Sequence, residues 1–179
     1  MNIFVTPFGQ LSWQDQSHRC ALGRTGIQTN KREGDGATPC GRLELKGVLY
    51  RADRLKKPQT ALSVRSINPK DGWCDDPNSQ CYNRFVTLPF LGSHEVLWRN
   101  DGLYDLLVIL RFNDDPPIAG AGSAIFLHVA APSFSPTEGC VAVAHATLYA
   151  LLADCAPGDL LCISPPRDTV KQRQAVLQI

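Results

Sequence analysis

The chain has 179 residues, 44% of them hydrophobic and 20% charged, which is enough apolar material for one compact domain with a single core. Its 18 basic and 17 acidic residues give a formal net charge of +1 and are scattered, which argues against the basic stripe of a nucleic-acid or anionic-membrane binder. No run reaches the roughly 18 apolar residues of a membrane helix, and the first residues lack the basic and apolar segments of an export signal.

Short strands dominate the elements expected along the single domain, which we place at residues 1–179. Apolar or alternating segments separated by Gly, Pro and Asp indicate strands at 43–49, 61–65, 104–110, 124–129 and 160–163. Apolar residues at three- and four-residue spacing indicate a helix over 144–155, a second short helix is expected near 94–98, and 165–179 begins as a polar tail. The sequence therefore predicts a mainly β fold with one or two short packed helices.

Seven cysteines leave two interpretations open. Reduced thiols pack as small hydrophobes, whereas an oxidising compartment would favour disulfides, with Cys74 and Cys81 as the easiest local pair. The spacings from Cys74 to Cys81 and from Cys140 to His145 do not match those of structural zinc sites, and no CxxC occurs. We therefore expect no metal.

Two loop segments carry mixed polar groups. Residues 71–84 combine aromatic, acidic, amide and guanidinium side chains, a mixture typical of loops that bind small polar ligands. The alternative is that Asp75, Asp76 and Asn78 form turns around Pro77. Residues 31–39 are either a solvated turn or a segment that presents charge to a carboxylate-bearing substrate.

His128 and Cys140 have the residue types and the context of a base and a nucleophile. A cysteine attacks a carbonyl as its thiolate, and a neighbouring imidazole can accept the thiol proton. Gly139 allows a close backbone turn whose amide groups can form an oxyanion hole, and Thr137 is expected to hold the loop or to orient the imidazole. Strand alternation predicts that Leu127 fills the core while His128 faces outward. His145 is the rival base.

Three motifs carry a family resemblance. They are Thr38-Pro39-Cys40-Gly41 before a strand, His128 at a strand end, and Thr137-x-Gly139-Cys140-Val141 before a helix. Over about residues 20–164 they resemble the L,D-transpeptidase catalytic domain (YkuD-like) family, and Trp73-Cys74-Asp75-Asp76-Pro77, Tyr82-Asn83-Arg84 and Asn113-Asp114 resemble a compact, signal-less proteobacterial branch. The resemblance implies a β-sandwich or barrel-type fold in which Cys140 is the nucleophile and His128 the base, with no cofactor.

The resemblance also implies the substrate, which is the stem peptide of bacterial peptidoglycan. Arg84, Tyr82 and Asn83 are then candidates to hold its carboxylates and amides, and Asp76 or Asp75 to receive an ammonium group, although Arg84 pairing with Asp76 is the alternative.

Many relatives have a histidine where this chain has Glu138, an arginine where it has Ala142, and a longer gap between base and nucleophile. The bond attacked is therefore open.

Three outcomes remain at this stage. An L,D-transpeptidase passes the acyl group to an amine, an L,D-carboxypeptidase or other amidase passes it to water, and a peptidoglycan-binding module has lost activity. The presence of both His128 and Cys140 disfavours the module. The implied substrate places the protein in the cell envelope, whereas the absence of a visible signal leaves a cytoplasmic role on recycled muropeptides open; the oligomeric state is not indicated.

Overall fold

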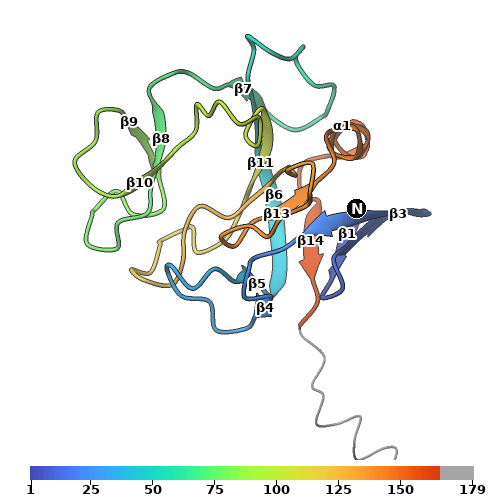
Figure 1. Ribbon diagram of the computed structural model, residues 1–179, viewed down its shortest axis with the longest axis horizontal. Helices are drawn as coiled ribbons and strands as arrows, with labels where there is room; N and C mark the ends of the chain where they lie inside the picture. Colours follow the sequence, from blue (N-terminus) through green and yellow to red (C-terminus); the bar gives the residue numbers. More distant parts are fainter. Residues whose placement is uncertain (166–179) are drawn as a thin grey trace, which may run out of the picture.

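The fold is built almost entirely of strands. A computed structural model describes residues 1–165 (Figure 1). The strands are β1 (Asn2–Thr6), β2 (Gln10–Trp13), β3 (Gln16–Ala21), β4 (Ile27–Gln28), β5 (Thr38–Pro39), β6 (Gly41–Tyr50), β7 (Val64–Ser66), β8 (Asp71–Cys74), β9 (Phe85–Thr87), β10 (His94–Val96), β11 (Leu106–Leu110), β12 (Phe126–Val129), β13 (Val141–Val143) and β14 (Leu160–Ile163). The described part of the chain has one helix, α1 (His145–Asp154).

The main sheet closes on itself to form a barrel. Its strands follow the order β11-β12-β13-β3-β2-β1-β14-β6, and β6 then pairs back to β11. The ten-residue strand β6 permits this closure because its first residues pair with β14 and its later residues pair with β11. The predicted mainly β fold of barrel type is therefore confirmed.

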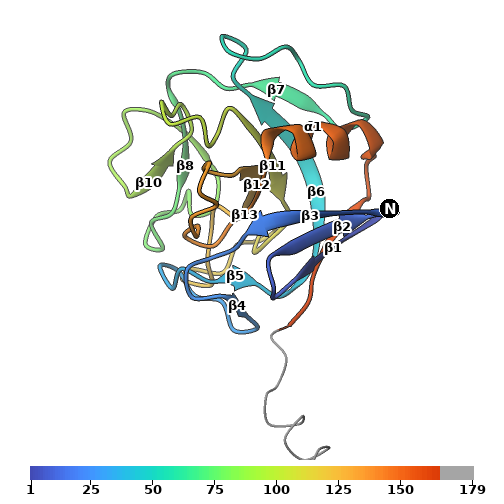
Figure 2. The same cartoon turned by 45° about the vertical axis from the view of Figure 1, so that its right-hand side comes forward.

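The barrel interior and α1 form one hydrophobic core. Leu11, Trp13 and Leu127 are buried inside it, and α1 adds Leu148 and Leu152 from one end of the barrel near β12 (Figure 2). Burial of each such side chain contributes about 1.5–3 kcal/mol before the entropy cost of folding. The predicted helix over 144–155 is thus present with slightly shorter bounds.

A separate three-stranded sheet, β10-β8-β9, flanks the barrel (Figure 1). Its Trp73 packs edge-on against Phe126 of β12 with ring centroids 5.3 Å apart. This contact belongs to a second hydrophobic cluster that also contains Tyr104 and Cys140. As a result, both faces of β12 are covered, one by the barrel core and the other by this cluster.

Several expectations need correction. The short helix expected near 94–98 is wrong, because His94–Val96 pairs antiparallel with β8 and strand pairing overrides the local pattern. The hairpin strands β1, β2 and β3 were not predicted.

The structure records all seven cysteines as free, including Cys74 and Cys81. Of the expected tail at 165–179, all but Pro165 lies outside the described residues. No helix found within residues 1–165 is long and apolar enough to cross a membrane.

Candidate active site

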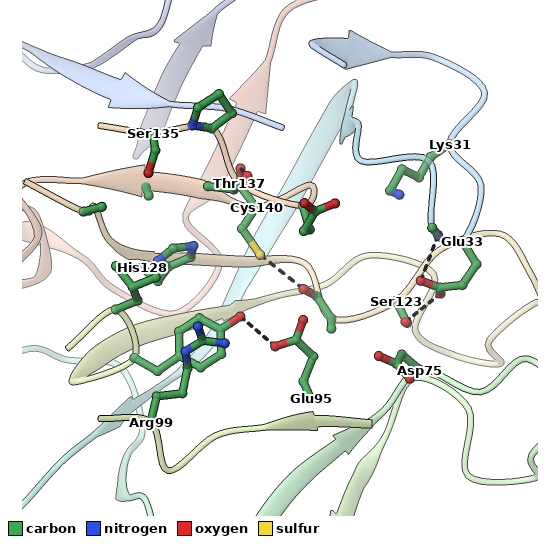
Figure 3. A pocket seen from close by; sticks show the side chains of 18 residues that line it. Lys31, Glu33, Asp75, Glu95, Arg99, Ser123, His128, Ser135, Thr137 and Cys140 are labelled. Carbon is green, nitrogen blue, oxygen red and sulfur yellow. Dashed lines mark hydrogen bonds between the residues drawn. The ribbon is translucent and has the colours of Figure 1, made fainter. Parts of the chain in front are cut away.

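A cavity of about 400 Å³ contains both His128 and Cys140 (Figure 3). Its walls come from the segment before β5, from the β10 region, from the end of β12 and from the turn before β13. A volume of this size lies within the usual range for small-ligand sites. The residue pair singled out in the sequence therefore shares one ligand-sized cavity.

Cys140 lies at the end of a tight turn, directly before β13. Its Sγ lies 3.3 Å from the backbone N–H of Phe126, which donates to it, and 3.3 Å from the carbonyl oxygen of Ala124, to which the thiol donates. Burial raises the pKa of the Cys140 thiol to about 12. The resting nucleophile is therefore a protonated thiol, and its proton must leave as the sulfur attacks.

His128 reaches the cavity because β12 and β13 are parallel neighbours. In this register His128 is opposite Ala142, two residues after Cys140, and Figure 3 shows the imidazole beside the sulfur. The Nδ1 atom lies 2.8 Å from the carbonyl oxygen of Val129, so we assign the Nδ1 proton to that hydrogen bond. This tautomer leaves Nε2 with a lone pair that can accept a proton.

The environment of His128 keeps the imidazole neutral. Its side chain is only 4% exposed, and burial lowers its pKa to about 4. The ring of Tyr104 packs edge-on against the imidazole with centroids 5.2 Å apart. The expectation that His128 faces outward is therefore wrong, because the flanking cluster covers that face of β12.

Thr137 holds the turn that carries the thiol. Its Oγ1 donates to the carbonyl oxygen of Cys140 at 2.7 Å and accepts from the backbone N–H of Gly139 at 3.2 Å. Thr38 Oγ1, at the start of β5, donates to the same Cys140 carbonyl at 3.3 Å. Both hydroxyls therefore fix the backbone of the nucleophile, and the recorded bonds of Thr137 are to the loop and not to the imidazole.

Gly139 is the turn residue at which a side chain would meet both backbone strain and a steric clash. Its φ is +141°, and a Cβ built there would lie 2.8 Å from the carbonyl oxygen of Ala37. We expect Gly139→Ala to lower the free energy of unfolding by at least about 1–3 kcal/mol from backbone strain, and to lower activity because Cys140 moves. Urea unfolding and steady-state kinetics measure the two effects.

The control for this substitution is Gly158→Ala. Gly158 also has a positive φ, +89°, but nothing lies within 4 Å of its Cβ position, and it is outside the cavity. It should lose stability with unchanged activity. Equal losses of activity in the two variants would contradict the role assigned to the Gly139 turn.

Carboxylates occupy one side of the cavity. Glu33 accepts hydrogen bonds from Tyr82 Oη at 2.5 Å and from Ser123 Oγ at 2.6 Å. Glu95 accepts one from Tyr104 Oη at 3.0 Å, and burial raises the pKa of its carboxyl group. Asp75 Oδ1 is buried and has no hydrogen-bond partner among the described residues. This side is therefore negatively charged.

Two cations line the same cavity, and each already has an acidic partner. Arg99 forms an ion pair with Asp101, with Nη2 2.5 Å from Oδ2. Its guanidinium also lies over the Tyr104 ring, 5.0 Å from the ring centroid. Lys31 pairs with Asp35 at 2.5 Å. Lys31 of the segment 31–39 thus lines the cavity, and its contact with a substrate stays a prediction.

The four predicted substrate contacts lie outside the cavity wall. Tyr82 bonds to Glu33, and Asn83 bonds to Trp73 and to the backbone at 112, 113 and 124. Asp76 Oδ1 accepts from the backbone N–H of Asn78 at 3.0 Å, as the turn alternative expects. Arg84 is exposed, and no ion pair joins it to Asp76 within residues 1–165. Their role in substrate binding stays a prediction.

Other candidates do not compete for the site. His145 is exposed and packs against the ring of Tyr149, with centroids 4.8 Å apart. A search of the described residues finds no group of three or more His, Cys, Asp or Glu side chains placed to hold a metal ion. Sequence reasoning missed Tyr104, Glu95 and Arg99, for which no local motif gives a signal.

Comparison with known proteins agrees with this geometry. A family model described as the L,D-transpeptidase catalytic domain (YkuD) matches residues 9–166. Searches of curated proteins and of solved structures gave no match. The matched range includes every residue that lines the cavity and most of the barrel. The chain therefore belongs to the L,D-transpeptidase catalytic domain family.

Proposed function

We propose that the protein is a cysteine acyltransferase that acts on peptidoglycan stem peptides, as an L,D-transpeptidase. The observation that supports this most is the placement of a buried thiol and a neutral imidazole on parallel neighbouring strands, within one cavity. Family membership supports the substrate class. The same thioester resolved by water is the second candidate, and it uses the same residues.

Acylation begins with proton transfer. Nε2 of His128 takes the thiol proton while Sγ of Cys140 bonds to the peptide carbonyl carbon, and the carbonyl oxygen becomes an oxyanion. The Gly139 N–H is engaged by Thr137 Oγ1. We therefore assign the oxyanion donor to the N–H of Cys140, in the turn fixed by the two threonine hydroxyls.

In the next steps His128 gives back the proton that it accepted. His128 returns its proton to the leaving amine, the C–N bond breaks, and a thioester remains on Cys140. An amine from a second stem peptide then attacks the thioester carbonyl, His128 accepts its proton, and the sulfur leaves and is reprotonated. Water in place of the amine gives hydrolysis.

The test is product analysis. Purified protein is incubated with a disaccharide tetrapeptide, and the products are resolved by mass. A cross-linked dimer supports transpeptidation, and a disaccharide tripeptide without dimer supports the hydrolytic candidate. No change in mass, under conditions where the protein is folded, contradicts both.

Arg99 is the proposed contact for the carboxylate of the departing residue. Figure 3 places it on the same side of the Cys140 sulfur as His128, which must protonate the leaving amine. Hydrogen bonds to charged groups contribute about 1.5–3 kcal/mol. We expect Arg99→Gln to lower kcat/KM by about 10- to 100-fold, mostly through KM, for donors that end in a carboxylate.

Two comparisons sharpen this prediction. A donor whose terminal carboxylate is converted to an amide should show little difference between wild type and Arg99→Gln. Arg42→Gln removes an exposed guanidinium outside the cavity and is the control. If Arg84→Gln loses activity on the carboxylate donor while Arg99→Gln does not, the contact belongs to Arg84 instead.

A further inference from the structure

Asn83 is a buried polar residue to which the acylation steps above assign no part. It is only 5% exposed, and all four hydrogen-bonding positions of its side chain are used. Nδ2 donates to the carbonyl oxygens of Phe112 at 2.9 Å and Asn113 at 2.7 Å, and Oδ1 accepts from Trp73 Nε1 at 2.9 Å. The fourth bond comes from the backbone N–H of Ala124 at 3.1 Å, and it leads to the nucleophile.

Ala124 contacts Cys140 through its carbonyl group. The thiol of Cys140 donates to this oxygen, with Sγ 3.3 Å away. Ala124 has a φ of +50°, which is sterically unfavourable for alanine and persists only where other contacts hold it. The bond to Asn83 Oδ1 is such a contact. Asn83 therefore helps to fix the direction of the carbonyl that faces the thiol.

The two hydrogen bonds of the sulfur are supported differently. The donor to Sγ, the N–H of Phe126, belongs to β12, where Phe126 pairs with Ile109 of β11. Ala124 precedes β12, and its N–H bonds to a side chain. Removal of the Asn83 side chain should therefore release the Ala124 carbonyl and leave the Phe126 donor in place.

Tyr82 supports the same segment two residues earlier. Its Oη accepts from the N–H of Gly122 at 3.0 Å while it donates to Glu33 at 2.5 Å. The consecutive residues Tyr82 and Asn83 thus hold Gly122 and Ala124. This pair has a use in the protein that does not depend on contact with the substrate.

The thiol proton at rest points away from the base. In Figure 3 the dashed line from the Cys140 sulfur, which marks the bond to the Ala124 carbonyl, runs away from His128. The S–H bond must therefore rotate about the Cβ–Sγ bond before Nε2 can accept the proton. A hydrogen bond donated by the neutral thiol also favours the protonated form.

We propose that Asn83 is a positioning residue that acts through Ala124. It aims the Ala124 carbonyl at the Cys140 thiol, so that the sulfur keeps one orientation and its resting proton lies on the side opposite His128. The catalytic consequence rests on the proposed function. The hydrogen bond of the thiol can be observed without any substrate.

The S–H stretching band of Cys140 in the infrared tests the proposal directly. The difference between the spectra of wild type and Cys140→Ser isolates this band from the other six cysteines. We expect a hydrogen-bonded band, at lower wavenumber than that of a free thiol. Asn83→Gly removes the side chain and keeps the positive φ of +55° without steric cost, and its band should move to the position of a free thiol. A free band in wild type, or an unchanged band in Asn83→Gly, overturns the inference.

Asn113→Gly is the matched control. Asn113 also has a positive φ, +46°, it lies outside the cavity, and the bonds recorded for its side chain are to the backbone of Ile118 and Gly122. It should lose stability in urea unfolding and keep the wild-type band. An equal shift of the band in both glycine variants would reflect general loosening and would overturn the role of Asn83.

Asn83→Asp is the second variant, and it keeps the test decisive if Asn83→Gly does not fold. The aspartate keeps an oxygen that can accept the Ala124 N–H. Its Cys140 band should therefore stay at the wild-type position. A free band in folded Asn83→Asp contradicts the proposal.

Two rates measure the consequences for the thiol. Alkylation of Cys140 by iodoacetamide at pH 8, followed by peptide mass, should be about 10-fold faster in Asn83→Gly, because loss of a bond made by the thiol form lowers its pKa. The value of kcat/KM with the disaccharide tetrapeptide should fall by about 10-fold, because the sulfur no longer keeps one orientation. Both rates should stay at wild-type values in Asn113→Gly.

The outcomes separate this inference from the proposed function. An unchanged alkylation rate, or an unchanged kcat/KM together with a shifted band, overturns the positioning role of Asn83. Wild-type protein that is folded and forms no product contradicts the proposed function. In that case the band and the alkylation rate still decide whether Asn83 holds the Cys140 thiol through Ala124.

Discussion

Cys140→Ser should reduce acyl transfer by about 10³-fold or more, while the protein remains folded. The serine hydroxyl can keep the contacts with the N–H of Phe126 and the carbonyl of Ala124 that the thiol makes. It is, however, a much weaker acid than a thiol, so transfer of its proton to the neutral imidazole of His128 is far less favourable than transfer of the Cys140 thiol proton. Intact-protein mass after incubation with donor checks this, because only wild type should gain the acyl mass.

Another cysteine serves as the control for this experiment. Cys162 lies on β14 outside the cavity and is only partly buried, so Cys162→Ser should keep both acylation and turnover. Acylation that persists in Cys140→Ser and disappears in another cysteine variant would assign the nucleophile elsewhere. Loss of acylation in Cys140→Ser together with loss of the cooperative unfolding transition would show that the fold, and not the thiol, was tested.

The order of residues around His128 and Cys140 was sufficient to predict that the two side chains lie in one cavity, because each follows local rules. An apolar strand ends near the histidine, and glycine before the cysteine permits a turn whose φ of +141° other residues rarely adopt. The sequence did not predict that β12 and β13 are parallel neighbours. That pairing depends on closure of the barrel through β6, which is a contact between distant segments.

The charged side chains of the cavity could not be predicted for a related reason. Glu95 lies in the segment 94–98 that was expected to be a helix, and Arg99 directly follows it; only the pairing with β8 turns Glu95 into the cavity. Conversely, Asn83 has the residue type of a ligand contact, but its side chain already makes four hydrogen bonds inside the protein. Residue type indicates what a side chain can bind, whereas tertiary contacts decide which partner it meets.

Glu138 and Ala142, the two residues that differ from many relatives, both line the cavity. Glu138 is exposed at the rim, where it pairs with Arg24 at 2.9 Å. Ala142 lies opposite His128 in the parallel ladder and lines the cavity, which therefore receives no guanidinium from that position. Arg99 brings a guanidinium into the same cavity from the segment after β10. The charge is thus supplied by a different element, which supports testing Arg99 first.

His128→Gln should reduce kcat/KM by about 10²- to 10⁴-fold, the range typical of lost general acid–base catalysis. Glutamine can keep a side-chain donor toward the carbonyl of Val129, but it cannot accept and return the thiol proton. Steady-state kinetics with the disaccharide tetrapeptide measures the loss, and melting temperature monitors the fold. His145→Gln is the control, because that exposed imidazole lies outside the cavity, and it should retain activity.

The pH dependence identifies the base more specifically than the loss of rate. Only the neutral imidazole can accept the proton, and burial lowers its pKa from near 6.5 to about 4, so the acid limb of wild-type kcat/KM should lie near pH 4. Below pH 6.5 the unfolded chain protonates this histidine before the folded protein does, so the free energy of unfolding should decrease by about 3 kcal/mol as pH falls toward 4. His128→Gln should remove that part of the decrease. A wild-type limb near pH 6.5, or an identical loss of stability in both proteins, would show that His128 is not the buried neutral base assigned here.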